Sequence, residues 1–292
     1  MSADPLIIKA CLNGIRGREV ASGVPWTPRE VADEARRCAD AGASMVHFHA
    51  RSDAGAISYD PAWYSEADRL IREETDLIVN HTTVRTSDVP IATVLRTLRE
   101  TNEPVDMIAL NPGYLVLHLP RAGESRETLV IPNSYSDIQA IINVCTERGI
   151  AIEPTALDTG FLSSVAMLVQ DGLLSSPRYL LLEFGGAFGD GFQIMPGNER
   201  SYRFLTECTR EVFPDAIWMA HGIGDSVFDI AKFAIADGAH VRVGFEDRAV
   251  LEDGRVASSN AEFVQWAVEQ GRAHGREPAS TSVARSKLLP QP

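Results

Sequence analysis

The chain has 292 residues, 45% of them hydrophobic and 23% charged, which is typical of a globular protein with a large core. Its formal net charge of −13 leaves no basic surface for nucleic acid and no polybasic patch for a membrane. The sequence has no apolar run of membrane-spanning length and no signal segment at its start, so we expect a cytoplasmic protein without nucleic-acid or membrane partners.

Apolar runs alternate with helix-start signals along the chain. The segment Thr27-Pro28-Arg29-Glu30 is the clearest signal, since it combines a capping residue, a first-turn proline and a glutamate three residues after the cap. Helices are predicted over residues 27–42, 60–74, 87–99, 134 or 136 to 149, from 158, 199–212, 225–238 and 259–273. Apolar strands are predicted over residues 6–12, 45–51, 77–82, 106–110, 150–153, 179–184, 216–221 and 240–245.

Eight strands therefore alternate with eight helices over one continuous chain. Continuous apolar strands favour a parallel sheet covered on both faces, and the simplest closure is a (β/α)8 barrel in one domain, residues 1–292. An open doubly wound sheet is the competing fold, but no Gly-x-Gly-x-x-Gly motif follows the first strand. Residues 114–119 and 128–131, around the turn 121–123, predict a hairpin-like insertion after the fourth strand. The C-terminal tail from Glu277 is expected to be ordered only by packing on other parts of the protein.

Four cysteines, Cys11, Cys38, Cys145 and Cys208, are spread along the chain without a Cys-x-x-Cys pair. This pattern indicates small buried side chains in a reducing compartment, and neither a disulfide framework nor a thiolate metal site.

His47 and His49 lie two residues apart at the end of the second predicted strand. Residues i and i+2 of a strand point to the same side, so both imidazoles can reach one metal ion. The alternative is a pair of half-buried strand histidines that bond to their neighbours. In the eighth predicted strand the same periodicity puts Glu246 on one face with Arg242. Two histidines and one carboxylate form the ligand pattern of a catalytic Zn²⁺ site with open positions, although another divalent ion is possible.

Polar residues also collect at the other strand ends, where a barrel places its active site. Candidate substrate-binding residues at these ends are Asn13, Thr83, Asn111 and Glu153, and Thr82 is a candidate catalytic hydroxyl. His81, His221 and His240 are each interpreted as structural. The backbone N–H groups of the glycine-rich segment 185–191 can bind a phosphate, but such a segment is more commonly a flexible loop.

The chain as a whole resembles the β-keto acid cleavage enzymes, whose first studied member is the 3-keto-5-aminohexanoate cleavage enzyme. The segments that carry the resemblance are Val-Pro-Trp-Thr-Pro-Arg-Glu at 24–30, Ala-Gly-Ala-Ser-Met-Val-His-Phe-His-Ala-Arg at 41–51, Leu-Asn-Pro-Gly at 110–113, Val-Arg-Val-Gly-Phe-Glu-Asp at 241–247 and Ser-Asn-Ala-Glu-Phe-Val at 259–264.

This resemblance implies a zinc-dependent barrel, a homotetramer and a reaction of a β-keto acid with acetyl-CoA that yields acetoacetate and a new acyl-CoA. It implies that His47, His49 and Glu246 hold the zinc. Arg242 and Asp247 would form a dyad that helps to remove a proton from acetyl-CoA, and Thr82, or less well Thr83, would supply a hydroxyl for acyl and CoA transfer.

Two departures from the family pattern bear on the substrate. The founding enzyme has an acidic residue shortly after the first strand, where this chain has Asn13-Gly14-Ile15, and it tends to carry a second glutamate on the fifth strand, where this chain has Thr155. The loss of acidic groups removes Coulomb attraction for a cationic side chain, so we expect a neutral or polar side chain on the keto acid.

Two other functions remain as alternatives. A metal-dependent hydrolase of the amidohydrolase type also uses a His-x-His pair in a barrel, but on the first strand, with further histidines on strands five and six. A non-catalytic binding protein on the same barrel would have lost the metal ligands or the dyad, and no candidate position is missing here.

Overall fold

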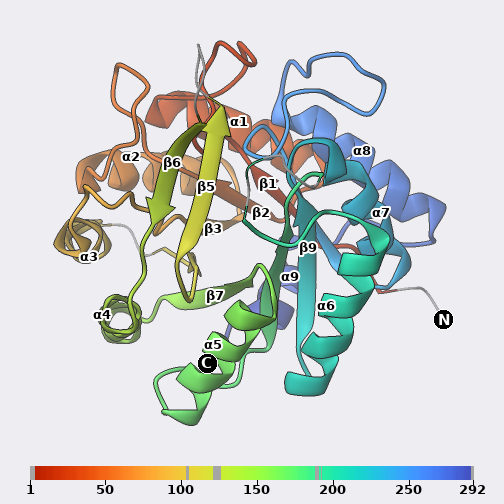
Figure 1. Ribbon diagram of the computed structural model, residues 1–292. Helices are drawn as coiled ribbons and strands as arrows, with labels where there is room; N and C mark the ends of the chain where they lie inside the picture. The colour runs from red at the N-terminus through yellow and green to blue at the C-terminus, as the bar shows by residue number, and fades with distance from the viewer. Residues whose placement is uncertain (1–3, 103–104, 121–125, 188–190, 192, 291–292) are drawn as a thin grey trace.

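The computed structural model describes residues 4–102, 105–120, 126–187, 191 and 193–290 (Figure 1). Eight parallel strands close into a barrel, and their order around it is β1-β10-β9-β8-β7-β4-β3-β2. The predicted (β/α)8 barrel is therefore confirmed. The barrel strands are β1 Ile8–Cys11, β2 Met45–Phe48, β3 Ile78–His81, β4 Met107–Leu110, β7 Ala151–Ala156, β8 Tyr179–Phe184, β9 Ile217–Gly222 and β10 His240–Val243.

Helices surround the barrel, and capping residues recognised in the sequence mark where helices such as the first one begin and end. The side chain of Thr27 accepts a hydrogen bond from the Glu30 amide and Glu30 bonds back to the cap, while Gly42 ends the same helix at φ 113°. Among the described residues no helix combines the length and the apolar character that crossing a membrane requires. The helices are α1 Pro28–Ala41, α2 Pro61–Glu74, α3 Ile91–Glu100, α4 Tyr135–Arg148, α5 Thr159–Gln170, α6 Glu199–Val212, α7 Val227–Ala236, α8 Asn260–Ala273 and α9 Thr281–Leu288.

One predicted helix start is wrong, and one predicted cap makes no capping hydrogen bond. Helix α3 begins at Ile91 behind Pro90, and not at residue 87, because the carboxylate of Asp88 accepts a hydrogen bond from Thr86 and does not cap the helix. Helix α7 has no side-chain cap, since the Ser226 hydroxyl donates instead to the Gly185 carbonyl at 2.7 Å.

The C-terminal tail forms a helix that the sequence did not reveal. In α9, Ala284 and Leu288 pack against Ile7, Met45 and other residues at the start of the barrel strands. This helix therefore closes the N-terminal end of the barrel, and the carboxyl end of the strands stays accessible for a site.

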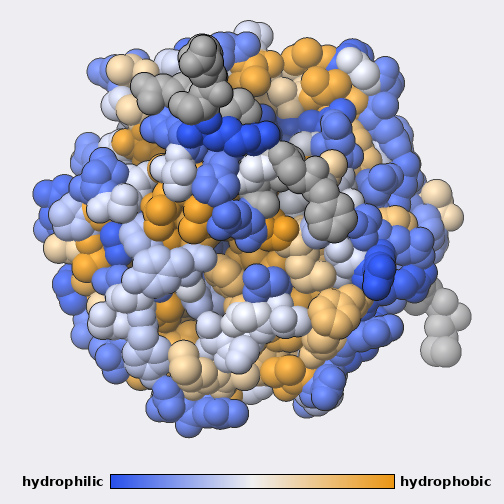
Figure 2. Space-filling model, in the orientation of Figure 1, coloured by the Kyte–Doolittle hydropathy of each residue, from blue (hydrophilic) through white to orange (hydrophobic). Residues whose placement is uncertain are grey.

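The chain between β4 and β7 forms an antiparallel pair of strands, β5 Leu115–Pro120 and β6 Arg126–Ile131. The predicted turn at 121–123 lies outside the described residues. Strand β5 also bonds to the loop after β8, because the His118 amide donates to the Gly191 carbonyl at 2.7 Å. Hydrophobic residues reach the surface among hydrophilic ones on the face of the molecule that carries this hairpin (Figures 1 and 2).

Inside the barrel, Lys9 of β1 forms an ion pair with Glu153 of β7. The Lys9 Nζ lies 2.6 and 2.8 Å from the two carboxylate oxygens, and both side chains are 0% exposed. Burial opposes the negative charge, but Lys9 holds the pKa of Glu153 below its usual range. Glu153 is therefore part of the barrel interior, and the structure does not place it at the predicted substrate site.

We expect Lys9→Met to lower the free energy of unfolding by about 3–5 kcal/mol, because it leaves the Glu153 carboxylate buried and unpaired. Urea denaturation measures the change. The double variant Lys9→Met/Glu153→Met removes both charges and should recover most of the loss. A double variant that is less stable than Lys9→Met would contradict this account.

Candidate active site

A cleft of about 550 Å³ opens at the carboxyl ends of the barrel strands. This is the end at which (β/α)8 enzymes build their active sites. Its polar lining residues are Arg16, Glu19, His47, His49, Thr82, Asn111, Thr155, Glu183, Arg242, Glu246 and Asp247.

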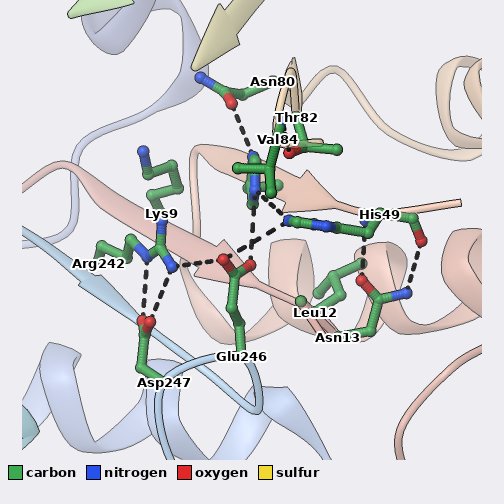
Figure 3. A network of polar contacts seen from close by, with 12 residues as sticks. Lys9, Leu12, Asn13, His49, Asn80, Thr82, Val84, Arg242, Glu246 and Asp247 are labelled. Atoms are coloured by element: carbon green, nitrogen blue, oxygen red, sulfur yellow. Dashed lines mark hydrogen bonds and ion pairs between the residues drawn. The ribbon is translucent and has the colours of Figure 1, made fainter. Parts of the chain in front are cut away.

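Both predicted histidine ligands line this cleft, and Figure 3 shows His49 directed at Glu246. The Nε2 atoms of His47 and His49 are 3.2 Å apart. The Glu246 carboxylate lies beside them, with one oxygen 3.5 Å from Nε2 of His47 and the other 3.7 Å from Nε2 of His49. The structure thus brings together the three donor atoms that the sequence placed on two different strands, all within 4.8 Å of one another.

Two asparagines hold the histidines in this arrangement. Nδ1 of His47 is hydrogen-bonded to Oδ1 of Asn80 at 2.8 Å, which leaves Nε2 directed at the cleft. Asn13 binds the backbone of His49, accepting from its amide at 2.9 Å and donating to its carbonyl at 3.0 Å. Asn13 is 0% exposed, so it supports the end of β2 from beside the site.

The protonation states of His47 and Glu246 suit a metal ion. Burial lowers the pKa of His47 to about 3, so its imidazole is neutral at physiological pH. Burial opposes the charge of Glu246, but Arg242 and the two histidines hold the pKa of this carboxyl well below its usual range. Its buried Oε2 has no hydrogen-bond partner among the described residues, as expected of an acceptor placed for a cation. Two imidazoles and a carboxylate fit a divalent metal with open coordination positions.

The predicted dyad is formed next to this donor set. Arg242 donates to both oxygens of Asp247, at 3.0 and 2.8 Å, and its Nη2 also lies 2.7 Å from a Glu246 oxygen. Burial opposes the ionisation of Asp247, but Arg242 and His221 lower its pKa to about 2. Asp247 is therefore a carboxylate whose orientation is fixed by a bidentate contact.

His221 of β9, which the sequence suggested to be structural, links the dyad to Glu183 of the neighbouring strand β8. It is 0% exposed, with Nδ1 3.4 Å from Asp247 and Nε2 3.3 Å from Glu183. Burial and Arg242 favour its neutral form, but the two carboxylates raise the pKa of His221 above its ordinary value. Its place at the end of a barrel strand was the only sequence signal for this contact.

The remaining predicted residues divide between the cleft and its surroundings. Thr82 and Asn111 line the cleft, whereas the Thr83 hydroxyl donates to the Ala109 carbonyl at 2.6 Å and does not face it. On β7 the cleft is lined by Thr155, two residues after the buried Glu153.

Fold and site together define a (β/α)8 barrel with a two-histidine, one-carboxylate donor set and an adjacent arginine–aspartate dyad. The profile of the family described as beta-keto acid cleavage enzyme matches residues 5–289. The chain belongs to this family, and the predicted family resemblance is confirmed. It is therefore an enzyme of the acyltransferase type that cleaves a carbon–carbon bond of a β-keto acid.

Individual relatives agree with this assignment. The chain is 30% identical over 287 residues to the 3-keto-5-aminohexanoate cleavage enzyme of Fusobacterium nucleatum, covering 98% of both chains. It is 28% identical over 261 residues to the 3,5-dioxohexanoate:acetyl-CoA acetone transferase of Paraburkholderia graminis, covering 83% of this chain and 81% of that one. The apo structure of ObcA superimposes with a TM-score of 0.71 at 16% identity over 90% of this chain, which spans 64% of the ObcA chain, and this likeness shows the fold alone.

Proposed function

We propose that the enzyme converts a β-keto acid and acetyl-CoA into acetoacetate and a new acyl-CoA, with a divalent metal, zinc in the first place, held by His47, His49 and Glu246. The observation that carries this proposal is the meeting of these three donors with the Arg242–Asp247 dyad in one cleft. When bound, the metal acts as a Lewis acid on the keto oxygen. The homotetramer and the cytoplasmic location stay predictions.

The products determine which carbon attacks. Acetoacetate contains the CH₂–COO⁻ unit of the keto acid joined to the acetyl group of acetyl-CoA. The new bond therefore joins C2 of the keto acid to the acetyl carbonyl carbon, and the C2–C3 bond breaks. The thiol sulfur leaves the acetyl carbon and ends on C3. The proton that must be removed is thus on C2 of the keto acid, and not on the methyl group of acetyl-CoA as the resemblance suggested.

Asp247 is proposed to take this proton and to return it. Its low pKa keeps it ionised at neutral pH but makes it a weak base, so it needs an acidic C–H bond. C2 of a β-keto acid is activated by the adjacent ketone, whose oxygen the metal would polarise, and is such a carbon. When C2–C3 breaks, the same proton can return to C2, so the step consumes no external acid. Arg242 keeps the carboxylate in place throughout.

Thr82 is proposed to act on the transferring thioester. Its side chain lines the cleft, and Oγ1 accepts a hydrogen bond from the Val84 amide at 3.0 Å, which leaves its hydroxyl proton free to donate. Donation to a developing oxyanion is the form of help that this hydroxyl can give. Asn111 lines the same cleft and is proposed to bind the keto acid.

The reaction is tested with the purified enzyme, acetyl-CoA and a panel of β-keto acids, following acetoacetate. We expect acetoacetate only when both substrates are present, and its loss with a chelator. A keto acid carrying ¹³C at C2 should place the label at C2 of acetoacetate. Turnover without acetyl-CoA would instead indicate the hydrolase alternative, which the family match already opposes.

A further inference from the structure

Charge is distributed unevenly around the mouth of the barrel. The ionisable residues that line the cleft come from β8, β10, β2 and the loop after β1, and with β9 these strands form one continuous arc of the barrel. The other arc consists of β7, β4 and β3, and among the described residues it contributes no ionisable group to the cleft. Its lining residues are Thr82, Val84, Ala109, Asn111, Leu115, Leu117, Ile131 and Thr155.

The hairpin makes this uncharged arc strongly apolar. Leu115 and Leu117 alternate along β5, and Leu115 stands opposite Ile131 of β6, so all three can present one face to the cleft. They pack with the fully buried Leu157 behind them. The bonds between β5 and residues 191 and 193 hold the hairpin in place from its other edge. We call Val84, Leu115, Leu117 and Ile131 the apolar wall.

Apart from Glu19, an exposed residue of the loop after β1 and so on the charged arc, the acidic groups and arginines of the cleft already have partners. Arg242 bonds to Asp247 and Glu246, and Glu183 lies 3.3 Å from His221. Arg16 donates to the main-chain carbonyls of residues 246 and 247 at 2.9 and 2.8 Å. A charged substrate side chain on the apolar wall would therefore be desolvated without a counter-ion there, which is costly.

The chemistry directs the substrate side chain toward the apolar wall. C3 of the keto acid is trigonal, with an oxygen, C2 and the side chain as its substituents. The oxygen must face the three metal donors, and C2 must face Asp247. The third substituent then points away from both, across the cleft from β10. Val84 lines the same cleft as the three metal donors and Asp247.

We propose that the natural substrate is a β-keto acid whose side chain is an uncharged alkyl group, and that the apolar wall on the β5–β6 hairpin selects it. This inference rests on the proposed function. It narrows the expected neutral or polar side chain to an apolar one, because the residues that surround it offer dispersion contacts and little hydrogen bonding.

The test measures kcat/KM for straight-chain β-keto acids of increasing length, with amino and carboxylate analogues of matched length. We expect roughly a tenfold gain for each added methylene until the wall is filled. We expect the charged analogues to react at least about 100-fold more slowly than the alkyl substrate of the same length. An amino-keto acid that reacts faster than its alkyl analogue would overturn the proposal.

Variants of Leu117 locate the determinant. Leu117→Ala should move the best chain length upward and Leu117→Phe should move it downward, each by one or two carbons. The control is Val130→Ala, which truncates an apolar side chain that alternates with Leu129 and Ile131 along β6, so it points to the other face of the hairpin and does not line the cleft. It should leave the length profile unchanged.

The outcomes separate this proposal from the reaction itself. Acetoacetate from every keto acid with no dependence on length would refute the apolar wall and leave the reaction standing. An unchanged length profile in both Leu117 variants, with a raised KM for acetyl-CoA, would assign the wall to the CoA side and overturn the proposal. No acetoacetate from any keto acid would refute the proposed function.

Discussion

Asp247→Asn is expected to lower kcat for acetoacetate formation by about 10³-fold, within the range that a general base contributes. Asparagine has nearly the same shape and can still accept a hydrogen bond from Arg242, but it cannot take a proton from C2. Because the carboxylate is proposed to act on the bound substrate, the KM for both substrates should change much less than kcat.

A loss of activity through misfolding must be distinguished from a loss of the general base. The contact between Arg242 and Glu246 at 2.7 Å remains in the variant, so the guanidinium keeps one anionic partner. Thermal unfolding and metal content of Asp247→Asn are therefore measured beside its activity. Asp253→Asn, at an exposed surface position, is the matched control and should keep full activity. Full activity of a folded, metal-loaded Asp247→Asn would show that another group removes the proton.

Deuterium exchange provides a second readout for the same residue. In ²H₂O the parent should exchange the C2 protons of the keto acid without acetyl-CoA, because deprotonation precedes condensation in the proposed sequence. Asp247→Asn should lose this exchange together with turnover. Exchange at the parental rate in an inactive variant would assign Asp247 to a later step.

The barrel was predictable because each of its strands is a continuous apolar run between helix signals. Buried parallel strands need apolar residues on both faces, and this requirement is visible in the sequence. The tail helix α9 was not predictable, since its few apolar residues gain partners only when the starts of the barrel strands, such as Met45 and Ile78, have met. Whether this helix forms depends more on tertiary packing than on local sequence signals.

The metal donors were predictable for a similar reason. The spacing of His47 and His49 and the alternation that leads to Glu246 are local properties of strands, and strand ends meet at one rim. Glu153 could not be assigned correctly, because its partner Lys9 lies 144 positions away in the sequence. The contact of His221 with Asp247 has the same long-range character.

Removal of one metal ligand is the second change with a large expected effect. Glu246→Gln should weaken binding of the metal by more than about 100-fold, above the 10–100-fold that a supporting residue typically contributes. The amide keeps the shape of the side chain but carries no negative charge to offset that of the cation. Metal content after dialysis, measured by elemental analysis, and titration with Zn²⁺ give the affinity, and acetoacetate formation should fall with it.

A graded series of variants distinguishes a ligand from a residue that merely lies nearby. Asn80→Ala removes the hydrogen bond to Nδ1 of His47 and should weaken metal binding by about 10–100-fold. Glu183→Gln removes a carboxylate that lines the same cleft but lies outside the donor set, so its metal affinity should equal that of the parent. Added metal should restore activity to Asn80→Ala at a lower concentration than Glu246→Gln requires. Equal metal affinity in Glu246→Gln and Glu183→Gln would remove Glu246 from the ligand set, and the two histidines would then need a different third donor.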